Sequence, residues 1–140
     1  MRKFLIFNIN DEMSILSKKN PYNIYRSLEQ IYKMKRKDLN VGMNIYEQII
    51  VPINVEKLNN ELFNTYKNNN YYSKVSNKHL FYNKYRPEDS KLIINNSYML
   101  LESDAVVPVF LKGLNKNKNL LACDFENRDY FWIDELLLCK

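Results

Sequence analysis

Few residues of this sequence have side chains that could serve as a nucleophile, a base or a metal ligand. His79 is the single histidine, and the cysteines are Cys123 and Cys139. A Cys123–His79 pair could form a thiolate nucleophile beside its base. However, Cys123 lies within the apolar run 120–125, and a buried cysteine is unreactive. The sequence therefore predicts that this pair is not catalytic.

The other candidates for catalysis or ligand binding are equally sparse. One histidine and two distant cysteines do not supply the closely spaced ligands of a metal site. A phosphate-binding loop needs several neighbouring glycines, whereas Gly42 and Gly113 stand alone. Asp124 and Glu126 could act as an acid–base pair, but neighbouring acids at a hairpin turn are usually solvated. We therefore expect no enzymatic activity, no metal, no cofactor and no small-molecule ligand.

Aromatic and basic side chains are interleaved between residues 71 and 86, and this stretch carries the main alternative function. Rings that stack on bases, beside lysines that meet phosphates, form a platform for single-stranded nucleic acid. A tyrosine-rich strand or loop in a lysine-rich sequence explains the same pattern, and no nucleic-acid fold signature accompanies it. We expect no direct nucleic-acid binding and keep a small basic nucleic-acid-binding module as the alternative. The residues are Tyr71, Tyr72, Lys74, Lys78, His79, Phe81, Tyr82, Lys84, Tyr85 and Arg86.

Length and composition limit the fold and the compartment. A chain of 140 residues with 46% hydrophobic residues can bury one core but hardly two. The net charge of +5 permits attraction to acidic partners without requiring it. The early apolar run at 4–7 is shorter than a secretory core or a membrane span. We expect one domain over residues 1–140, in the cytoplasm and away from membranes, with both cysteines as free thiols.

The first half of the sequence predicts one strand followed by helices. Residues 3–9 are apolar on both faces, which is typical of a strand in the centre of a sheet. Asn20 before Pro21 predicts the N-cap and first position of a helix, and Asn54 predicts the cap of another. Further helical patterns lie at 11–17 and 43–50.

The second half predicts two hairpins and one helix. The hairpins cover 91–103 and 120–133, and Phe125 and Trp132 of the second should be buried because their apolar areas are large. The helix should begin at residue 104 or 107 and end at 114, with Val106 on its apolar face. Residues 71–90 show no clear period and predict a strand or a loop.

This order of elements predicts the fold class. Helices are segregated from hairpins rather than alternating with single strands, which favours α+β over a parallel α/β design. We expect a mostly antiparallel sheet built from the N-terminal strand and the two hairpins. Three to four helices should pack against it.

The segment 11–17 is the candidate for contact with another protein. Met13 and Leu16 are three residues apart on a segment too short to need two buried faces. Exposed apolar residues beside a packed scaffold often mark a protein contact. Singly exposed hydrophobic residues are also common, so both interpretations stay open at this point.

The layout of the chain resembles the SirA family, the sporulation inhibitors of replication. The most specific similarity lies in the closing hairpin, where Leu121-Ala122-Cys123-Asp124-Phe125 and Tyr130-Phe131-Trp132 resemble the Leu-Ala-x-Asp-Phe and Tyr-x-Trp segments of the family. The short N-terminal apolar strand, the aromatic-striped helix and Pro52-Ile53 before the next helix agree with the family pattern.

The resemblance implies a function and a contact surface. It implies a non-enzymatic protein that binds domain I of the replication initiator DnaA and blocks the initiation of chromosome replication during sporulation. Aromatic contact residues of the family correspond in position to Met13 and Ser17, so Met and Ser stand here in place of rings. Polar contacts correspond to Ile45 and Gln48. Together with Leu16, these are the predicted partner-binding residues.

Overall fold

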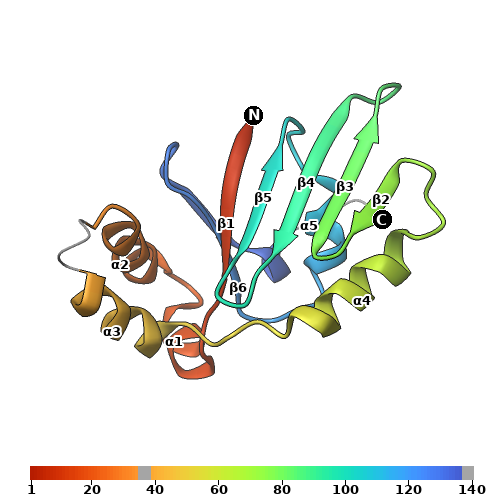
Figure 1. Cartoon of the computed structure of the whole chain (residues 1–140). Coiled ribbons are helices and arrows are strands. Elements are labelled where there is room, and N and C mark those ends of the chain that lie inside the picture. The colour runs from red at the N-terminus through yellow and green to blue at the C-terminus, as the bar shows by residue number, and fades with distance from the viewer. Residues whose placement is uncertain (35–38, 137–140) are drawn as a thin grey trace.

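One antiparallel sheet with helices on both faces forms the framework of the molecule (Figure 1). The computed structural model describes residues 1–34 and 39–136. Within this part of the chain the sheet has seven strands in the order β2-β3-β4-β5-β1-β6-β7. The strands are β1 (Arg2–Asn8), β2 (Tyr72–Val75), β3 (Lys78–Asn83), β4 (Glu88–Ile94), β5 (Met99–Ser103), β6 (Leu120–Asp124) and β7 (Asp129–Trp132).

The helices divide between the two faces of the sheet. Helices α4 and α5 cover one face, and α2 with α3 packs on the other face near β1 and β6. In the described residues the helices are α1 (Asp11–Ser17), α2 (Tyr22–Tyr32), α3 (Leu39–Ile49), α4 (Val55–Tyr66), α5 (Val109–Leu114) and the 3-10 helix η2 (Ile133–Glu135). None of these helices is long and apolar enough to cross a membrane.

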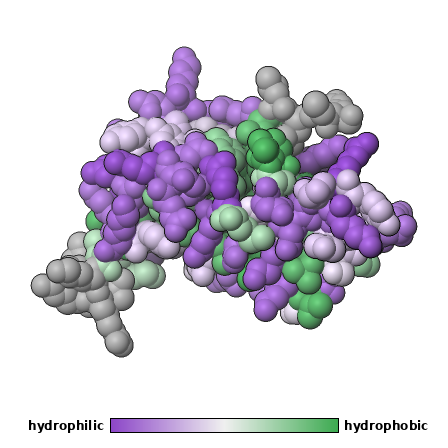
Figure 2. All heavy atoms as spheres, turned by 90° about the horizontal axis from the view of Figure 1, so that it is seen from above, coloured by the Kyte–Doolittle hydropathy of each residue, from purple (hydrophilic) through white to green (hydrophobic). Residues whose placement is uncertain are grey.

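Two hydrophobic clusters lie on opposite faces of the sheet because successive side chains of a strand point to opposite sides. On β1, Phe4 and Ile6 join the cluster under α4 and α5, whereas Phe7 joins the cluster under α2 and α3. Both faces of β1 are therefore covered, which explains why its sequence is apolar on both faces. Outside the clusters, Figure 2 shows a mostly hydrophilic surface with small groups of hydrophobic side chains between the hydrophilic ones.

Most of the predicted architecture is confirmed. The fold is α+β, β1 lies in the centre of the sheet, and both predicted hairpins are present as β4–β5 and β6–β7. Phe125 and Trp132 are buried. Asn54 caps α4, since its Oδ1 accepts a hydrogen bond from the backbone N–H of Lys57 at 3.1 Å.

Three predictions about the elements are wrong or incomplete. Residues 71–90 form β2, β3 and the start of β4, so the sheet has more strands than the N-terminal strand and two hairpins provide. The helix predicted to begin at residue 104 or 107 starts only at Val109, and Val106 is 91% exposed. Pro21 rather than Asn20 is the N-cap of α2, while the Asn20 side chain accepts from the N–H of Tyr22 at 3.2 Å.

Candidate partner-binding surface

Helix α1 begins at a polar junction with the end of α3. The Asn10 Oδ1 accepts from the backbone N–H of Met13 at 2.8 Å, which satisfies a donor that the first helical turn leaves free. The Asn10 Nδ2 donates to the carbonyl of Gln48, and its backbone N–H donates to the carbonyl of Ile49 at 2.8 Å. One asparagine therefore caps α1 and joins it to α3.

The other contacts of α1 are also polar. The Ser14 hydroxyl donates to Oδ1 of Asn119 at 2.6 Å, and Nδ2 of Asn119 donates to Oδ1 of Asp11 at 2.6 Å. Asn119 has a φ of 69°, in the left-handed region that asparagine tolerates better than most residues.

A salt bridge fixes the chain just beyond α1. The Lys18 ammonium lies 2.8 Å from Oδ1 of Asp134, and it also lies 4.6 Å from the centre of the Trp132 ring. Helix α1 is thus fixed at both ends with little apolar burial.

The outward face of α1 carries two exposed apolar side chains. Ile15 is 77% exposed and Leu16 is 82% exposed, whereas Ser14 is buried. At about 100° per residue, the inward side of this helix holds Met13, Ser14 and Ser17. Met13 accordingly packs against the cluster under α2 and α3, and Ser17 is half-buried. Met13 is therefore half-buried rather than exposed as expected, and Ile15 is the exposed apolar residue next to Leu16.

Ile45 and Gln48 lie on the exposed side of α3. They are three residues apart, so they share one face of the helix. The hydrogen bond from Asn10 to the Gln48 carbonyl brings this face next to the start of α1. We call Ile15, Leu16, Ile45 and Gln48 the α1–α3 surface. Three of its four residues were predicted, and its fourth is Ile15.

His79 is fully buried and serves the packing of the sheet against α4. The Tyr72 hydroxyl lies 2.8 Å from Nδ1, and Oδ1 of Asn59 lies 2.8 Å from Nε2. Because the amide oxygen can only accept, Nε2 carries the proton and Tyr72 donates to Nδ1. Burial, with a smaller contribution from Lys74, lowers the pKa of His79 to about 4.

Cys123 is far from His79 in the sheet. Strands β4, β5 and β1 separate β3 from β6, which places the two residues roughly 19 Å apart at about 4.8 Å per strand. Cys123 is a free, fully buried thiol whose pKa is raised by burial, so its predicted burial is confirmed. Cys139 lies outside the described residues.

Asp124 is a structural carboxylate at the start of the β6–β7 turn. Its Oδ2 lies 3.0 Å from Nε of Arg2 and accepts from Nδ2 of Asn127 at 2.7 Å. Burial raises the pKa of Asp124, but the hydrogen bonds from Asn127 and Arg2 outweigh burial and lower it below its ordinary value. Glu126 is exposed. Asp124 is thus buried and Glu126 is solvated. Through its ion pair with Arg2, Asp124 connects the β6–β7 turn to β1.

The stretch 71–86 divides its aromatic rings between the core and the solvent. Tyr72, His79 and Phe81 pack around Phe110 of α5. Tyr82 and Tyr85 are exposed, and they lie on the strand and turn that lead to β4. Several of the rings that were considered for stacking on bases thus belong to the core.

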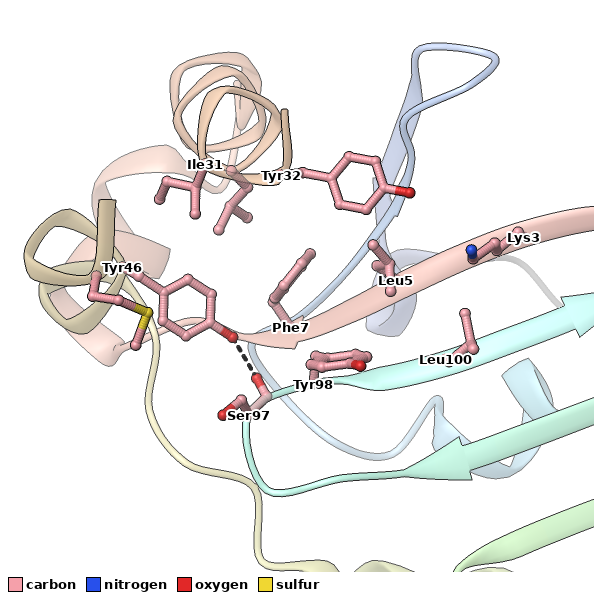
Figure 3. Close-up of a pocket in the computed structure, with 11 residues that line it drawn as sticks. Lys3, Leu5, Phe7, Ile31, Tyr32, Tyr46, Ser97, Tyr98 and Leu100 are labelled. Carbon is pink, nitrogen blue, oxygen red and sulfur yellow. Dashed lines mark hydrogen bonds between the residues drawn. The ribbon is translucent and has the colours of Figure 1, made fainter. Parts of the chain in front are cut away.

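A groove of about 390 Å³ lies between α2, α3 and the sheet (Figure 3). The Tyr46 hydroxyl donates to the carbonyl of Ser97 at 2.7 Å, which links α3 to the β4–β5 turn beside the groove. The sequence did not predict this groove because separate helices and strands each contribute at most three lining residues. The lining residues are Lys3, Leu5, Phe7, Leu28, Ile31, Tyr32, Met43, Tyr46, Ser97, Tyr98 and Leu100.

The fold and these surfaces define a class of protein. It is an α+β protein in which the polar side chains Ser14, His79 and Asp124 bind other parts of the chain, while apolar side chains are exposed on fixed helices. In the described part of the chain no three His, Cys, Asp or Glu side chains are placed to hold a metal ion. Exposed apolar side chains on a fixed scaffold often mark a contact with another molecule.

The chain belongs to the SirA family. The family model described as "Sporulation inhibitor of replication protein SirA" matches residues 2–136. The match runs from the start of β1 to the residue after η2, so it includes both the α1–α3 surface and the closing hairpin. The resemblance noted in the sequence is thereby confirmed. A search of curated proteins finds no match.

Proposed function

We propose that this protein inhibits the initiation of chromosome replication during sporulation by binding domain I of DnaA through the α1–α3 surface. Membership of a family of sporulation inhibitors of replication supports the inhibition. The observation that carries the contact is the pair of exposed apolar side chains, Ile15 and Leu16, on a helix that polar contacts hold in place. The proposal needs no catalysis and no cofactor.

The way α1 is fixed favours its use as a recognition element. Binding costs free energy when flexible groups become ordered, and a helix fixed before binding avoids much of this cost. The contacts of Asn10, Asn119 and Lys18, together with the packing of Met13, hold α1 without using Ile15 or Leu16. Binding energy in such interfaces concentrates in a few apolar anchors. Ile15 and Leu16 are these anchors.

The remaining predicted residues take different roles. The exposed Ile45 adds a further apolar contact with the partner, and the exposed Gln48 side chain orients the partner by hydrogen bonding. Met13 supports α1 from its inner side, and Ser17 lies at the margin of the surface.

The test compares two exposed apolar pairs on the same protein. The double variant Ile15→Ala with Leu16→Ala should lose roughly 2–4 kcal/mol of affinity for DnaA domain I, because anchors dominate the binding energy. Isothermal titration calorimetry measures the affinity, and circular dichroism melts check the fold. The control is Val106→Ala with Val107→Ala, a pair that is 91% and 56% exposed in the loop before α5. The control should bind DnaA domain I as the wild type does.

Two outcomes would contradict the proposal in different ways. No binding of the wild-type protein to DnaA domain I would show that the partner is wrong. Binding that survives the α1 changes but is lost in the Val106 and Val107 control would show that the surface is wrong. The variant Met13→Ala distinguishes a residue that stabilises α1 from one that contacts the partner. It should lower the melting temperature more than Leu16→Ala does.

A further inference from the structure

The groove beside α2 plays no part in the proposed contact with DnaA. Its volume of about 390 Å³ lies within the range of small-molecule sites, roughly 300–1,000 Å³. Figure 3 shows Ile31 and Tyr32 of α2 on one side, Leu100 on the other, and Leu5 of β1 between them. The walls are apolar, as is usual for a site that takes the hydrocarbon part of a ligand.

The two ends of the groove differ in polarity. At one end the Tyr46 hydroxyl already donates to the Ser97 carbonyl, and the Tyr46 ring meets Phe7 edge-on with ring centres 6.1 Å apart. This end therefore presents aromatic carbon. At the other end lies Lys3, which among the described lining residues is the one with a charged side chain (Figure 3).

Two carboxylates near Lys3 do not occupy the position in front of its ammonium group within the groove. Glu102 stands opposite Lys3 in the β1–β5 register, but its Oε1 lies 3.8 Å from the ammonium of Lys91. Glu126 contributes to a separate, smaller hollow of about 40 Å³ beside Lys3 and does not line the groove. A carboxylate at the mouth of the groove would thus meet the ammonium of Lys3 directly.

The length of the groove indicates the length of the ligand. Lys3, Leu5 and Phe7 alternate along one face of β1, and four residues at about 3.3 Å each separate Lys3 from Phe7 by roughly 13 Å. An extended chain advances about 3.6 Å over three bonds, so 13 Å corresponds to roughly ten or eleven bonds. A saturated chain of about eleven carbons, close to the length of decanoate, spans this distance.

We propose that the groove binds a free medium-chain fatty acid, with its carboxylate at Lys3 and its hydrocarbon chain along Leu5, Phe7 and Leu100. This proposal departs from the expectation from the sequence, in which no small-molecule ligand was foreseen. The hydrogen bond between Tyr46 and Ser97 closes one end, which suits a chain that enters end-on and opposes a partner helix that must lie across the groove. This function is separate from the binding of DnaA.

The test uses sodium decanoate below its micelle-forming concentration and the whole chain, with calorimetry as the readout. Wild-type protein should bind one decanoate. Lys3→Met, which keeps the apolar stem, should weaken binding roughly tenfold because a charge-assisted contact is lost. The matched control Lys112→Met removes an exposed lysine from α5, on the other face of the sheet and outside the groove lining, and should change the affinity little. Decanol should bind more weakly than decanoate and should not respond to the Lys3 change.

Filling the groove gives an independent readout. Leu100→Trp should abolish decanoate binding, and Met43→Trp, at a half-exposed position, does the same if the first variant unfolds. Absence of saturable decanoate binding overturns the proposal. Binding that both tryptophan variants keep also overturns it. So does an equal loss of affinity in Lys112→Met and Lys3→Met, or an affinity for decanol equal to that for decanoate. Association only with lipid vesicles would point to a membrane surface and would overturn it as well.

Discussion

Helices α1 and α4 begin with the same cap but place their apolar side chains in opposite ways. In each, the Oδ1 of an asparagine accepts a hydrogen bond from the backbone N–H three residues later. Asn10 accepts from Met13, and Asn54 accepts from Lys57. Helix α4 then buries three of its apolar residues in the core while Phe63 stays exposed, whereas the buried residue of α1 is a serine. The apolar side chains buried on α4 are Leu58, Leu62 and Tyr66, and those exposed on α1 are Ile15 and Leu16.

This difference separates two ways of fixing a helix. Helix α4 is held by burial of apolar area, which is the dominant source of folding free energy. Helix α1 is held by directed polar contacts with Gln48, Asn119 and the chain near Asp134. Each such contact contributes less, but together they leave the apolar side chains of α1 available for a partner.

The largest expected effect comes from removing an apolar side chain on each helix. Leu62→Ala on α4 should lower the free energy of unfolding by about 3–4 kcal/mol, because it leaves a cavity in the core. Leu16→Ala on α1 should change it by less than about 0.5 kcal/mol, because that side chain is exposed. Urea unfolding measures both values. A similar loss for the two variants would show that α1 depends on apolar packing after all.

A smaller effect concerns pH and is confined to the α4 side. The pKa of His79 is about 4 in the folded protein and 6.5 ordinarily, so between these values the unfolded chain binds a proton that the folded chain does not. The contribution of His79 is therefore complete above about pH 6.5 and is lost as the pH falls toward 4. We expect a loss on the order of 2 kcal/mol between about pH 7.5 and 4.5.

The control for this pH effect is a residue that cannot titrate. His79→Gln should flatten the dependence of the unfolding free energy on pH over the same interval, even if it lowers stability at every pH. Stopping near pH 4.5 keeps Asp124 ionised in the folded state, since its pKa is lowered. A pH dependence that is unchanged in the glutamine variant would assign it to other groups.

The smallest effect compares the two caps directly. Asn54→Ala and Asn10→Ala should each cost about 1 kcal/mol of stability, the usual value for a lost N-cap. Only Asn10→Ala should also weaken binding to DnaA domain I, because it loosens the junction between α1 and α3. Thermal melts and calorimetry on both variants give the comparison. Equal binding by the two variants would show that the orientation of α1 does not matter for the contact.

Elements with one dominant local signal could be predicted from the sequence. The doubly apolar β1, the β4–β5 and β6–β7 hairpins and the cap at Asn54 each follow from a short pattern. Strands β2 and β3 were not predicted as separate strands, because polar and apolar residues do not alternate along them as expected for a strand with one buried face. The polar His79 faces the core, while the aromatic Tyr82 on the same strand faces solvent.

The start of α5 shows how a spacing can mislead. Val106, Phe110 and Leu114 recur every four residues, which favours one helical face. The residue before a proline avoids the helical region, however, so Val107 cannot continue a helix into Pro108. The helix begins at Val109, and Val106 belongs to an exposed loop.

The candidate site was predictable only in part because it depends on which side of α1 faces inward. Sequence spacing groups Met13 with Leu16, but the contacts of Ser14 and Asn119 fix the rotation of the helix and turn Met13 toward the core. The positions on α3 were located through the family resemblance.

The central place of β1 has a consequence for the time at which this protein can fold. Arg2 pairs with Ser103 and Leu5 pairs with Cys123, so the first strand has no partner strand in the sheet until about 100 further residues have been made. At roughly 5–20 residues per second, the strand waits about 5–20 s on the ribosome. Pairing between such distant segments also slows folding once they are present. The sheet that positions α1 therefore forms after synthesis of the closing hairpin, and nascent chains need protection of the apolar β1 until then.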